Sequence, residues 1–300
     1  MLITFLLGPW TSLYFAGNTL DFFALLLCAA LGAAVCFRAG LFNMGLDAQI
    51  YAGSVAASAV MLNFPNGFAP LILCLACLAA LTTGFLMGGL CGFLKKITGA
   101  NEVITTFLLS GAVSPVADYI INTFLREPSG NLISSRHFPE NFMLYRFFDI
   151  STLSVSFIFV IMLPFLAQIF LYSTKSGYAF RIAGSAPAFA RYGGINPENY
   201  WIPALGASGA LGGLCGFFAM TGTYGQCYQG WTGGLGWAAI TVALLAENKM
   251  LPLIPAAIFY TQLKRGTDSV LLESAIRFES SGLIQAIVLL VATVKIKRRF

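Results

Sequence analysis

The chain has 300 residues, of which 58% are hydrophobic and only 10% are charged, and its mean hydropathy is +0.80. A soluble globular domain carries roughly 25% charged residues, so this composition excludes a soluble protein and predicts an all-α, polytopic membrane protein. The formal net charge of +5 does not indicate nucleic-acid binding, because basic residues in membrane proteins usually mark cytoplasmic loops.

A helix that crosses a bilayer needs about 20 mostly apolar residues. Runs of this kind predict about ten transmembrane helices within a single domain, residues 1–300. In chain order, the expected helix cores are 3–17, 20–37, 45–62, 69–94, 102–123, 151–173, 199–221, 232–246, 251–263 and 281–294.

The distribution of basic residues predicts that both termini lie in the cytoplasm, since cytoplasmic loops are enriched in Lys and Arg. In this orientation the cytoplasmic basic residues are Arg38, Lys95, Lys96, Lys175, Arg181, Arg191, Lys249, Lys295, Lys297, Arg298 and Arg299. The outer ones are fewer and are mixed with acidic residues; they are Arg126, Arg136, Arg146, Lys264, Arg265 and Arg277.

Three further segments are too polar to cross a bilayer. Residues 124–150 and the amphipathic segment 265–279 are predicted to face outward. Residues 175–200 are predicted to face the cytoplasm, with a short helix near 186–192 that stops at Gly193 and Gly194. Asn196 followed by Pro197 then indicates the start of the next helix, because Asn caps a helix N-terminus and Pro fits its first turn.

Glycines recur every four residues in two of the predicted helices. The pattern comprises Gly84, Gly88 and Gly92, together with the pairs Gly209/Gly213 and Gly212/Gly216. Small residues at this spacing let helices approach closely in lipid, which favours a packing role over the alternative of a flexible gate.

Residues that carry catalysis or bind metals are scarce. Cys74 and Cys77 form a C-x-x-C pair inside an apolar run, without a second pair or a nearby His, and are interpreted as packing residues. His137 is the single His and lies in a polar loop, so a metal cluster held by several His side chains is excluded. No Walker A pattern occurs, so we expect neither a cofactor nor ATP hydrolysis by this chain.

The most informative stretch is Arg38–Gln49, where Asn43, Asp47 and Gln49 lie between two long apolar runs. Polar side chains are costly where no water is present, so these residues either line a translocation path or hold a break between helices. The alternative interpretation is that Asn43 and Asp47 cap helix ends. Asn101 and Glu102 are likewise either path residues or an N-cap followed by a first-turn acid.

A second polar run, 222–236, is too rich in Gly for a straight membrane span. Irregular backbone at membrane depth is tolerated only inside protein or beside a water-filled cavity. Tyr224, Tyr228 and Trp231 could stack on a planar cargo; the alternative is an interfacial aromatic belt at an outer loop.

Four motifs carry a resemblance to a known family. Residues 39–49, AGLFNMGLDAQ, resemble the GxFNIGxEGQ signature of ABC-importer permeases of the nucleoside, simple-sugar and branched-chain amino-acid superfamily. Residues 99–106 (GANEVITT), 190–196 (ARYGGIN) and 234–245 (GLGWAAITVALL) resemble that family's GxNEVIST, ARYAGIN and GxGFxGIAVALL, in the same order. The first two motifs resemble most the nucleoside branch, whose members include riboflavin permeases.

The chain departs from the family pattern at four places. Asp47 and Ala48 replace the usual Glu-Gly, residues 184–187 (GSAP) replace GENP, Ala246 and Glu247 replace Gly-Arg, and Ala238 stands where nucleoside members often have Asp. These departures bear on the cargo and leave the permease role intact.

The resemblance implies a pore-forming permease subunit, not an enzyme, in the bacterial cytoplasmic (inner) membrane, which works by alternating access on a nucleoside or a related heterocycle such as riboflavin. The implied partners are a second permease subunit, identical or related, two cytoplasmic ABC ATPase subunits, an extracytoplasmic substrate-binding protein and membrane lipid, with no nucleic acid.

Two alternatives remain, a simple-sugar cargo and an ion-coupled secondary transporter. The ion-coupled transporter would need buried acids, for which Asp47, Glu102 and Asp118 are the candidates.

Two sets of site residues follow from the motifs. The expected path residues are Asn43, Asp47, Gln49, Asn101, Glu102, Thr105, Tyr224, Gln226 and Trp231. The ATPases are expected to dock on residues 180–196, through Arg181, Gly184, Ala190, Arg191, Tyr192, Gly193, Gly194 and Asn196.

Overall fold

The structure is a computed structural model that describes residues 2–128 and 132–273, and in these residues it consists of helices and loops without a regular β-sheet. The α-helices are α1 (Leu2–Leu7), α2 (Leu13–Arg38), α3 (Leu46–Asn63), α4 (Ala69–Thr98), α5 (Glu102–Ile120), α6 (Ser156–Ser173), α7 (Lys175–Ser185), α8 (Pro187–Tyr192), α9 (Trp201–Phe218), α10 (Leu235–Leu245) and α11 (Leu253–Glu273). Short 3-10 helices occupy Gly8–Trp10, Glu140–Phe142 and Pro197–Tyr200, and π-helical turns extend α5 over Ile121–Leu125 and α9 over Ala219–Tyr224. The predicted helix 281–294 lies outside the described residues.

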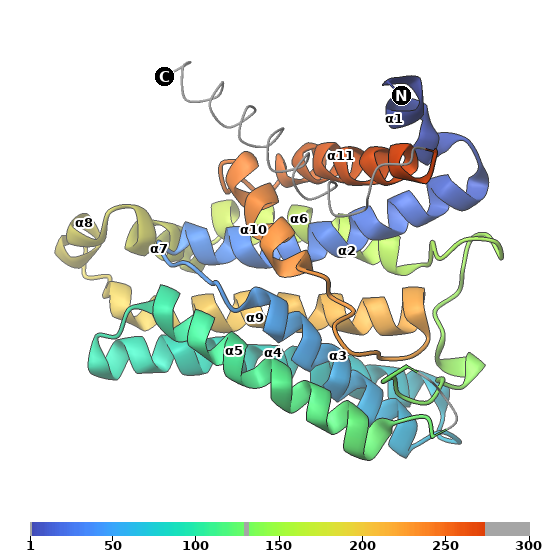
Figure 1. Ribbon diagram of the computed structural model, residues 1–300. Coiled ribbons are helices and arrows are strands. Elements are labelled where there is room, and N and C mark those ends of the chain that lie inside the picture. Colours follow the sequence, from blue (N-terminus) through green and yellow to red (C-terminus); the bar gives the residue numbers. More distant parts are fainter. Residues whose placement is uncertain (1, 129–131, 274–300) are drawn as a thin grey trace.

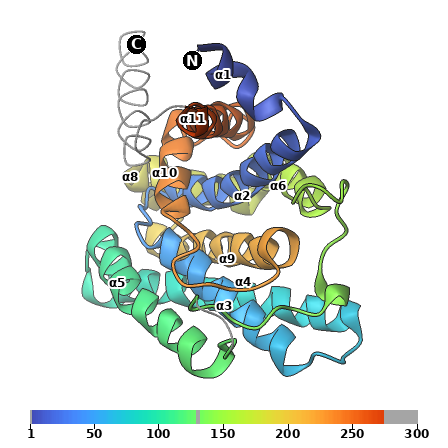
Figure 2. The ribbon, with the colours of Figure 1, turned by 45° about the vertical axis from the view of Figure 1, so that its right-hand side comes forward.

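The long helices pack in layers, which Figure 1 shows from top to bottom: α11, then α2 with α10, then α9, and below it α4 and α5, with α3 running obliquely down to their level. Helix α6 lies behind α2 in this view, and the turned view of Figure 2 separates α5 from the rest of the bundle. The all-α class predicted from the composition is confirmed for the described residues.

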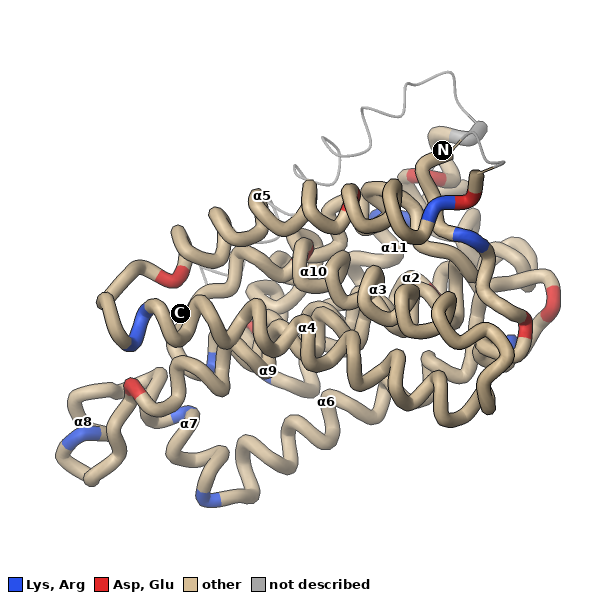
Figure 3. The backbone as a smooth tube through the Cα atoms, turned by 90° about the horizontal axis from the view of Figure 1, so that it is seen from below, with Lys and Arg blue, Asp and Glu red and all other residues tan. Residues whose placement is uncertain are grey.

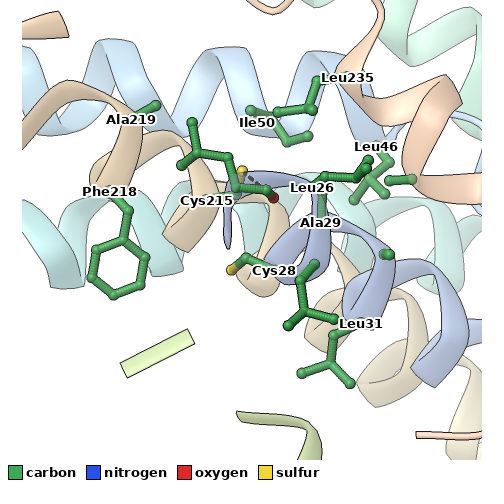
Figure 4. Packing of buried hydrophobic residues seen from close by; sticks show 14 of the residues in the cluster. Leu26, Cys28, Ala29, Leu31, Leu46, Ile50, Cys215, Phe218, Ala219 and Leu235 are labelled. Atoms are coloured by element: carbon green, nitrogen blue, oxygen red, sulfur yellow. Dashed lines mark hydrogen bonds between the residues drawn. The ribbon is translucent and has the colours of Figure 1, made fainter. Parts of the chain in front are cut away.

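The core lies where α2, α3, α9 and α10 meet. Figure 4 shows Leu26 of α2, Leu46 and Ile50 of α3, Cys215 of α9 and Leu235 of α10 packed together. Leu26, Leu46 and Ile50 are completely buried, and burying an aliphatic side chain of this size stabilises the fold by about 1.5–3 kcal/mol. One contiguous cluster of buried side chains extends from this point through the bundle.

The glycine repeats bring α4 and α9 into backbone contact. A Cβ atom at Gly84 would overlap the carbonyl oxygen of Gly209, and one at Gly88 would overlap that of Leu205. A Cβ atom at Gly213 would in turn overlap the carbonyl oxygen of Ala80. The packing role predicted for these glycines is therefore confirmed.

Among the described residues, five helices are long and apolar enough to cross a membrane: α2, α4, α5, α6 and α9, with the flanking turns of α5 and α9 included. Helix α10 has 11 residues and is therefore about 16 Å long at 1.5 Å per residue, roughly half of the ~30 Å hydrocarbon core. The protein is thus a multi-pass membrane protein, while the predicted number of ten transmembrane helices is not confirmed.

The N-terminal boundaries predicted from the sequence are wrong. Instead of two helices, 3–17 and 20–37, the structure has the six-residue α1, a 3-10 turn at Gly8–Trp10 and one continuous helix, α2. Ser12 starts α2 by accepting a hydrogen bond from the backbone N–H of Phe15 (3.3 Å). Helix α1 lies at the end of the molecule opposite α8 (Figure 1), so the cytoplasmic position predicted for the N-terminus is not confirmed.

The C-terminal part also differs. Helix α11 continues to Glu273, beyond the predicted core 251–263, and so includes the first half of the segment expected to be an outer amphipathic region. Figure 3 shows that most charged residues lie towards the two ends of the long helices, and the middle of the bundle carries few. This separation is what a bilayer requires of a protein that crosses it.

The loop between α5 and α6, predicted as an outward polar segment, is folded onto the bundle. Its backbone N–H groups at Ser135 and Phe138 donate to the carbonyl oxygens of Cys227 (2.7 Å) and Gly225 (2.9 Å). Phe142 is completely buried. Through these two hydrogen bonds the α5–α6 loop fixes the position of the α9–α10 connection.

Candidate functional site

The polar residues after α2 form a closed network inside the protein. The Nδ2 group of Asn43 donates to Gln49 Oε1 (2.7 Å) and to Ser208 Oγ (2.9 Å), and its Oδ1 atom accepts from the N–H of Gly45 (3.0 Å). Asn43, Gln49 and Ser208 are all buried. Because a buried polar group needs partners, this network fixes the connection between α2 and α3 against α9.

Asp47 joins the starts of two helices. It lies in the first turn of α3, and its Oδ1 atom accepts from the backbone N–H of Gly236 in the first turn of α10 (2.9 Å). Its Oδ2 atom accepts from the hydroxyl of Thr232 (2.9 Å). Helix N-termini attract negative charge, so this one partly buried carboxylate stabilises both α3 and the short α10.

Asn101 and Glu102 form the start of α5. Asn101 Oδ1 accepts from the N–H of Val103 (2.9 Å), which confirms the interpretation of Asn101 as an N-cap. Glu102 forms an ion pair with Lys95 at the end of α4 (2.6 Å). Thr105 is half-buried, and its hydroxyl donates to the carbonyl oxygen of Glu102 (3.2 Å). Asn101 itself is exposed at the N-terminus of α5.

The aromatic residues of the α9–α10 connection pack on one another. The ring of Tyr224 lies 5.3 Å from that of Tyr228 and 5.4 Å from that of Trp231, measured between centroids. Trp231 is buried and its indole N–H donates to Ser54 Oγ on α3 (2.9 Å). Gln226 is partly exposed in the same loop. The cluster anchors the irregular backbone to α3.

The predicted coupling segment contains two short helices, where one was expected. Helix α8 (Pro187–Tyr192) agrees with the predicted 186–192, and Gly194 follows it with a φ of 76°, a left-handed conformation that favours glycine. Asn196 caps the following turn by accepting from the N–H of Glu198 (3.1 Å). The preceding α7 was not foreseen; Thr174 caps it by accepting from the N–H of Gly177 (3.0 Å).

The side chains of this segment fall into two groups. Phe189 and Tyr192 are 62% and 93% exposed, and Arg191 makes only a long contact with Glu198 (3.4 Å). Arg181 is tied to the bundle, since its Nε group donates to the carbonyl oxygen of Leu171 (2.8 Å) and its guanidinium lies over the ring of Tyr172. Gly184 and Ala190 face inward, and Gly193 donates its N–H to the carbonyl oxygen of Phe189 (3.1 Å).

The partners of two further acids were not predicted from the sequence. Asp118 of α5, named above as a candidate buried acid, accepts from the hydroxyl of Tyr51 on α3 (2.5 Å) and from the amide of Gln229 (3.0 Å). Asp21 of α2 is buried and accepts from the hydroxyls of Thr152 (2.9 Å) and Thr223 (2.8 Å). An Asp inside a long apolar helix was the available signal for this second acid.

Within residues 2–128 and 132–273, no group of three or more His, Cys, Asp or Glu side chains is arranged to hold a metal ion. The four acids described above each have a protein donor or an ion-pair partner. The site is therefore a set of helix ends joined by hydrogen bonds and one ion pair.

Comparison with known proteins identifies the family of this chain. A profile described as the permease component of branched-chain amino acid transport systems matches residues 15–293. The chain belongs to this family of transport permeases. The resemblance carried by the four sequence motifs is thereby confirmed.

Individual relatives support this membership. The permease is 30% identical over 289 residues, which is 96% of this chain and 77% of the relative, to the "Probable riboflavin import permease protein RfuC" of Treponema pallidum. It is 28% identical over 287 residues, 94% of this chain and 82% of the relative, to the "Guanosine ABC transporter permease protein NupP" of Bacillus subtilis.

The permease is also similar in fold to the solved structure of PsaBC from Streptococcus pneumoniae in complex with a Fab, with a TM-score of 0.56 and 15% identity over 97% of this chain and 95% of that chain. At this identity the likeness concerns the fold alone.

Proposed function

We propose that this permease is a membrane subunit of a bacterial ABC importer, and that its cargo is a nucleoside or a related heterocycle such as riboflavin. The observation that carries this proposal is that two relatives, one named for riboflavin import and one named as a guanosine ABC transporter permease, align with 94–96% of the chain. Both named cargoes are planar heterocycles that carry a sugar or a sugar-derived chain. The whole of 1–300 would then form one transmembrane domain in the bacterial inner membrane.

In this proposal the end that carries α7 and α8 faces the cytoplasm. Lys95, Arg38 and Arg181 lie at this end, close to the ends of α4 and α2 and to α7, as the excess of positive charge on cytoplasmic loops requires. The outer loops around 132–155 and 225–234 would receive the extracytoplasmic binding protein.

The two ATPase subunits would dock on residues 180–196. Exposed aromatic side chains at the tip of a short helix are typical of binding surfaces, where Tyr, Trp and Arg supply most of the binding energy. Phe189, Arg191 and Tyr192 of α8 are such residues. Helix α8 lies at the far end of the molecule from α1 (Figure 1).

The translocation path would follow the face on which α5, the start of α3 and α10 lie (Figure 1). Helix α5 exposes most of its surface to the outside of this chain, and α10 exposes Trp237 on its first turn. Thr105, Asp47, Asn101, Glu102 and Gln226 are partly exposed and would border the path. The buried Asn43, Gln49 and Trp231 would shape it from behind, and a second permease subunit would close its open side.

The acids of the chain favour this proposal over an ion-coupled transporter. Asp21, Asp47 and Asp118 each accept hydrogen bonds from two different protein groups that fix them in place, and Glu102 is paired with Lys95. Each of these four acids therefore has a structural role in the chain that does not require a proton or ion relay.

The proposal is tested by purifying the tagged permease from its native membrane in mild detergent and identifying the proteins that come with it. We expect an ATPase subunit and a binding protein, and we expect the reconstituted assembly to take up guanosine or riboflavin only with ATP. Uptake by the permease alone, driven by an ion gradient without ATP, would overturn the proposal. Uptake of glucose in preference to both heterocycles would overturn the cargo assignment.

A further inference from the structure

The connection between α2 and α3, residues 39–45, is in contact with α7. Gly184 lies so close to it that a Cβ atom there would overlap the carbonyl carbon of Ala39 and come within 2.5 Å of the backbone nitrogen of Gly40. A Cβ atom at Gly40 would likewise come within 2.8 Å of the carbonyl oxygen of Gly184. No side chain separates the two backbones, so a displacement of α7 towards the bundle is passed directly to this linker.

The other end of the linker is held equally firmly. The backbone N–H of Met44 donates to the hydroxyl of Thr106 (3.0 Å), and a Cβ atom at Gly45 would come within 2.7 Å of the carbonyl oxygen of Thr106. Asn43 binds Gln49 and Ser208, as described above. Because both ends of residues 39–45 are constrained, we expect the linker to move as a rigid segment and not to change its conformation.

The residues on either side of this linker hold α10 at both of its ends. Asp47, two residues after the linker, binds the N-terminus of α10 through Gly236 (2.9 Å). Arg38, the residue before the linker, donates from Nε to the carbonyl oxygen of Asn248 (2.6 Å), just after the C-terminus of α10. The short helix is therefore bracketed by one continuous stretch of chain.

The covalent route from the coupling segment leads elsewhere. Residues 193–200 connect α8 to α9, and α9 is locked to α4 by the backbone contacts of Gly209 and Gly213. Interfaces packed this closely resist gradual deformation. When α7 and α8 are displaced, α9 therefore resists the movement, and the linker is the other element in contact with the coupling segment that can receive it.

We propose that residues 39–45 transmit movement of the coupling segment to α10. In this arrangement Gly184 and Gly40 form the input contact, Asp47 and Arg38 form the two output contacts, and α10 moves as a rigid unit at the border of the path. This inference rests on the proposed docking of the ATPases at residues 180–196. Gly184, Gly40, Arg38 and Asp47 are positioning residues, since none of them has to touch the cargo for this role.

The first test compares two glycine substitutions in the complete reconstituted importer. Gly184→Ala inserts a methyl group between α7 and the linker, whereas Gly89→Ala on α4 is the control, since the nearest atom to its Cβ would be 3.7 Å away and Gly89 belongs to neither set of site residues. We expect Gly184→Ala to lower the cargo imported per ATP hydrolysed by roughly tenfold, within the range typical of coupling between sites, and Gly89→Ala to leave it unchanged.

The second test follows α10 directly and does not depend on uptake. Hydrogen exchange of peptides covering 187–196 and 235–245 is measured in the complete importer with and without ATP and vanadate. In the wild type we expect both regions to respond; in Gly184→Ala we expect 187–196 to respond while the response of 235–245 is lost. Asp47→Ala, which removes the contact to Gly236, should uncouple the same two regions.

The outcomes separate this inference from the proposed function. If 235–245 still responds in both Gly184→Ala and Asp47→Ala, the linker is not the transmission route, although the ATPases do act on the coupling segment. If 187–196 shows no response to the nucleotide in the wild type, the proposed docking site is itself wrong, and the inference fails with it.

Discussion

Helices α9 and α5 both run the length of the bundle, but the chain surrounds them differently. Of their apolar segments, 67% of the residues are buried for α9 against 17% for α5. Their glycine contacts show the same contrast. Gly209 of α9 touches the backbone of α4, whereas a Cβ atom on Gly111 of α5 would meet nothing within 4 Å.

This contrast distinguishes a helix that packs closely within its own chain, α9, from a helix that leaves one face open, α5. Lipid is as apolar as a leucine side chain, so helices gain little from hydrophobicity when they associate and depend on close packing instead. The α4–α9 pair achieves this with glycines, and the result is a rigid core. Helix α5 has no such contact on its outer side, which leaves that face for lipid or for another subunit. The substitutions below test this division, starting with the largest expected effect.

The largest effect is expected in the α4–α9 pair. Gly84→Ala places a methyl group on the carbonyl oxygen of Gly209 and should lower the free energy of unfolding by about 3 kcal/mol, at the upper end of what overpacking costs. The measurement is the melting temperature of the detergent-solubilised permease, followed by size-exclusion chromatography after heating.

A matched control for this substitution lies in the same helix. The nearest atom to a Cβ on Gly89 would be 3.7 Å away, on the ring of Phe85, so Gly89→Ala should leave the melting temperature unchanged or raise it slightly. Equal melting temperatures for Gly84→Ala and Gly89→Ala would show that the α4–α9 contact is not the rigid element we describe.

The next effect concerns an open surface that we assign to a partner. Replacing both Phe189 and Tyr192 of α8 by Ala should weaken capture of the ATPase subunit by about 2 kcal/mol or more, roughly thirtyfold, as for aromatic residues at the centre of an interface. The melting temperature of the permease alone should not change, since both side chains are exposed. Undiminished capture in a titration with the purified ATPase would remove α8 from the docking surface.

A smaller effect is expected for Trp231, whose indole N–H donates to Ser54 across 2.9 Å. Trp231→Phe keeps an aromatic ring but loses this hydrogen bond, and should destabilise the permease by about 1 kcal/mol. Trp237 on α10 is 46% exposed, so Trp237→Phe is the control and should leave the melting temperature unchanged. Identical behaviour of the two variants would contradict the anchoring role of the loop.

The parts of the fold that could be predicted depend on local signals. The cap at Asn101, the end of α8 at Gly193 and Gly194, and the cap at Asn196 need only their immediate neighbours in the chain. The glycine repeat of α4 needs only the knowledge that small residues favour close packing. Each of these features was therefore visible in the sequence.

The parts that could not be predicted depend on distant partners. The sequence predicted a break at residues 18–19 between two helices, but Thr152, 131 residues after Asp21, donates hydrogen bonds to both Asn18 and Asp21, and α2 runs on unbroken. The partner of Asp47 is Gly236, 189 residues away. A single sequence marks such polar residues as needing an explanation, but it does not identify the groups that satisfy them.

The smallest effect on stability is expected at Gly111, and it addresses the open face of α5 most directly. Because nothing lies within 4 Å of its Cβ position, Gly111→Trp should change the free energy of unfolding of the solubilised permease by no more than about 0.5 kcal/mol. If the face lies against a second permease subunit, as we propose, the bulky ring should nevertheless abolish uptake and dimer formation, measured by reconstitution and by mass photometry. A face that contacts only lipid would tolerate the Trp in all three measurements, because lipid chains rearrange around a side chain and a second protein surface does not. In that case α9 would contact protein and the outer face of α5 would contact lipid. If the Trp abolishes uptake and dimer formation, both helices contact protein, α9 within this chain and α5 in a second subunit.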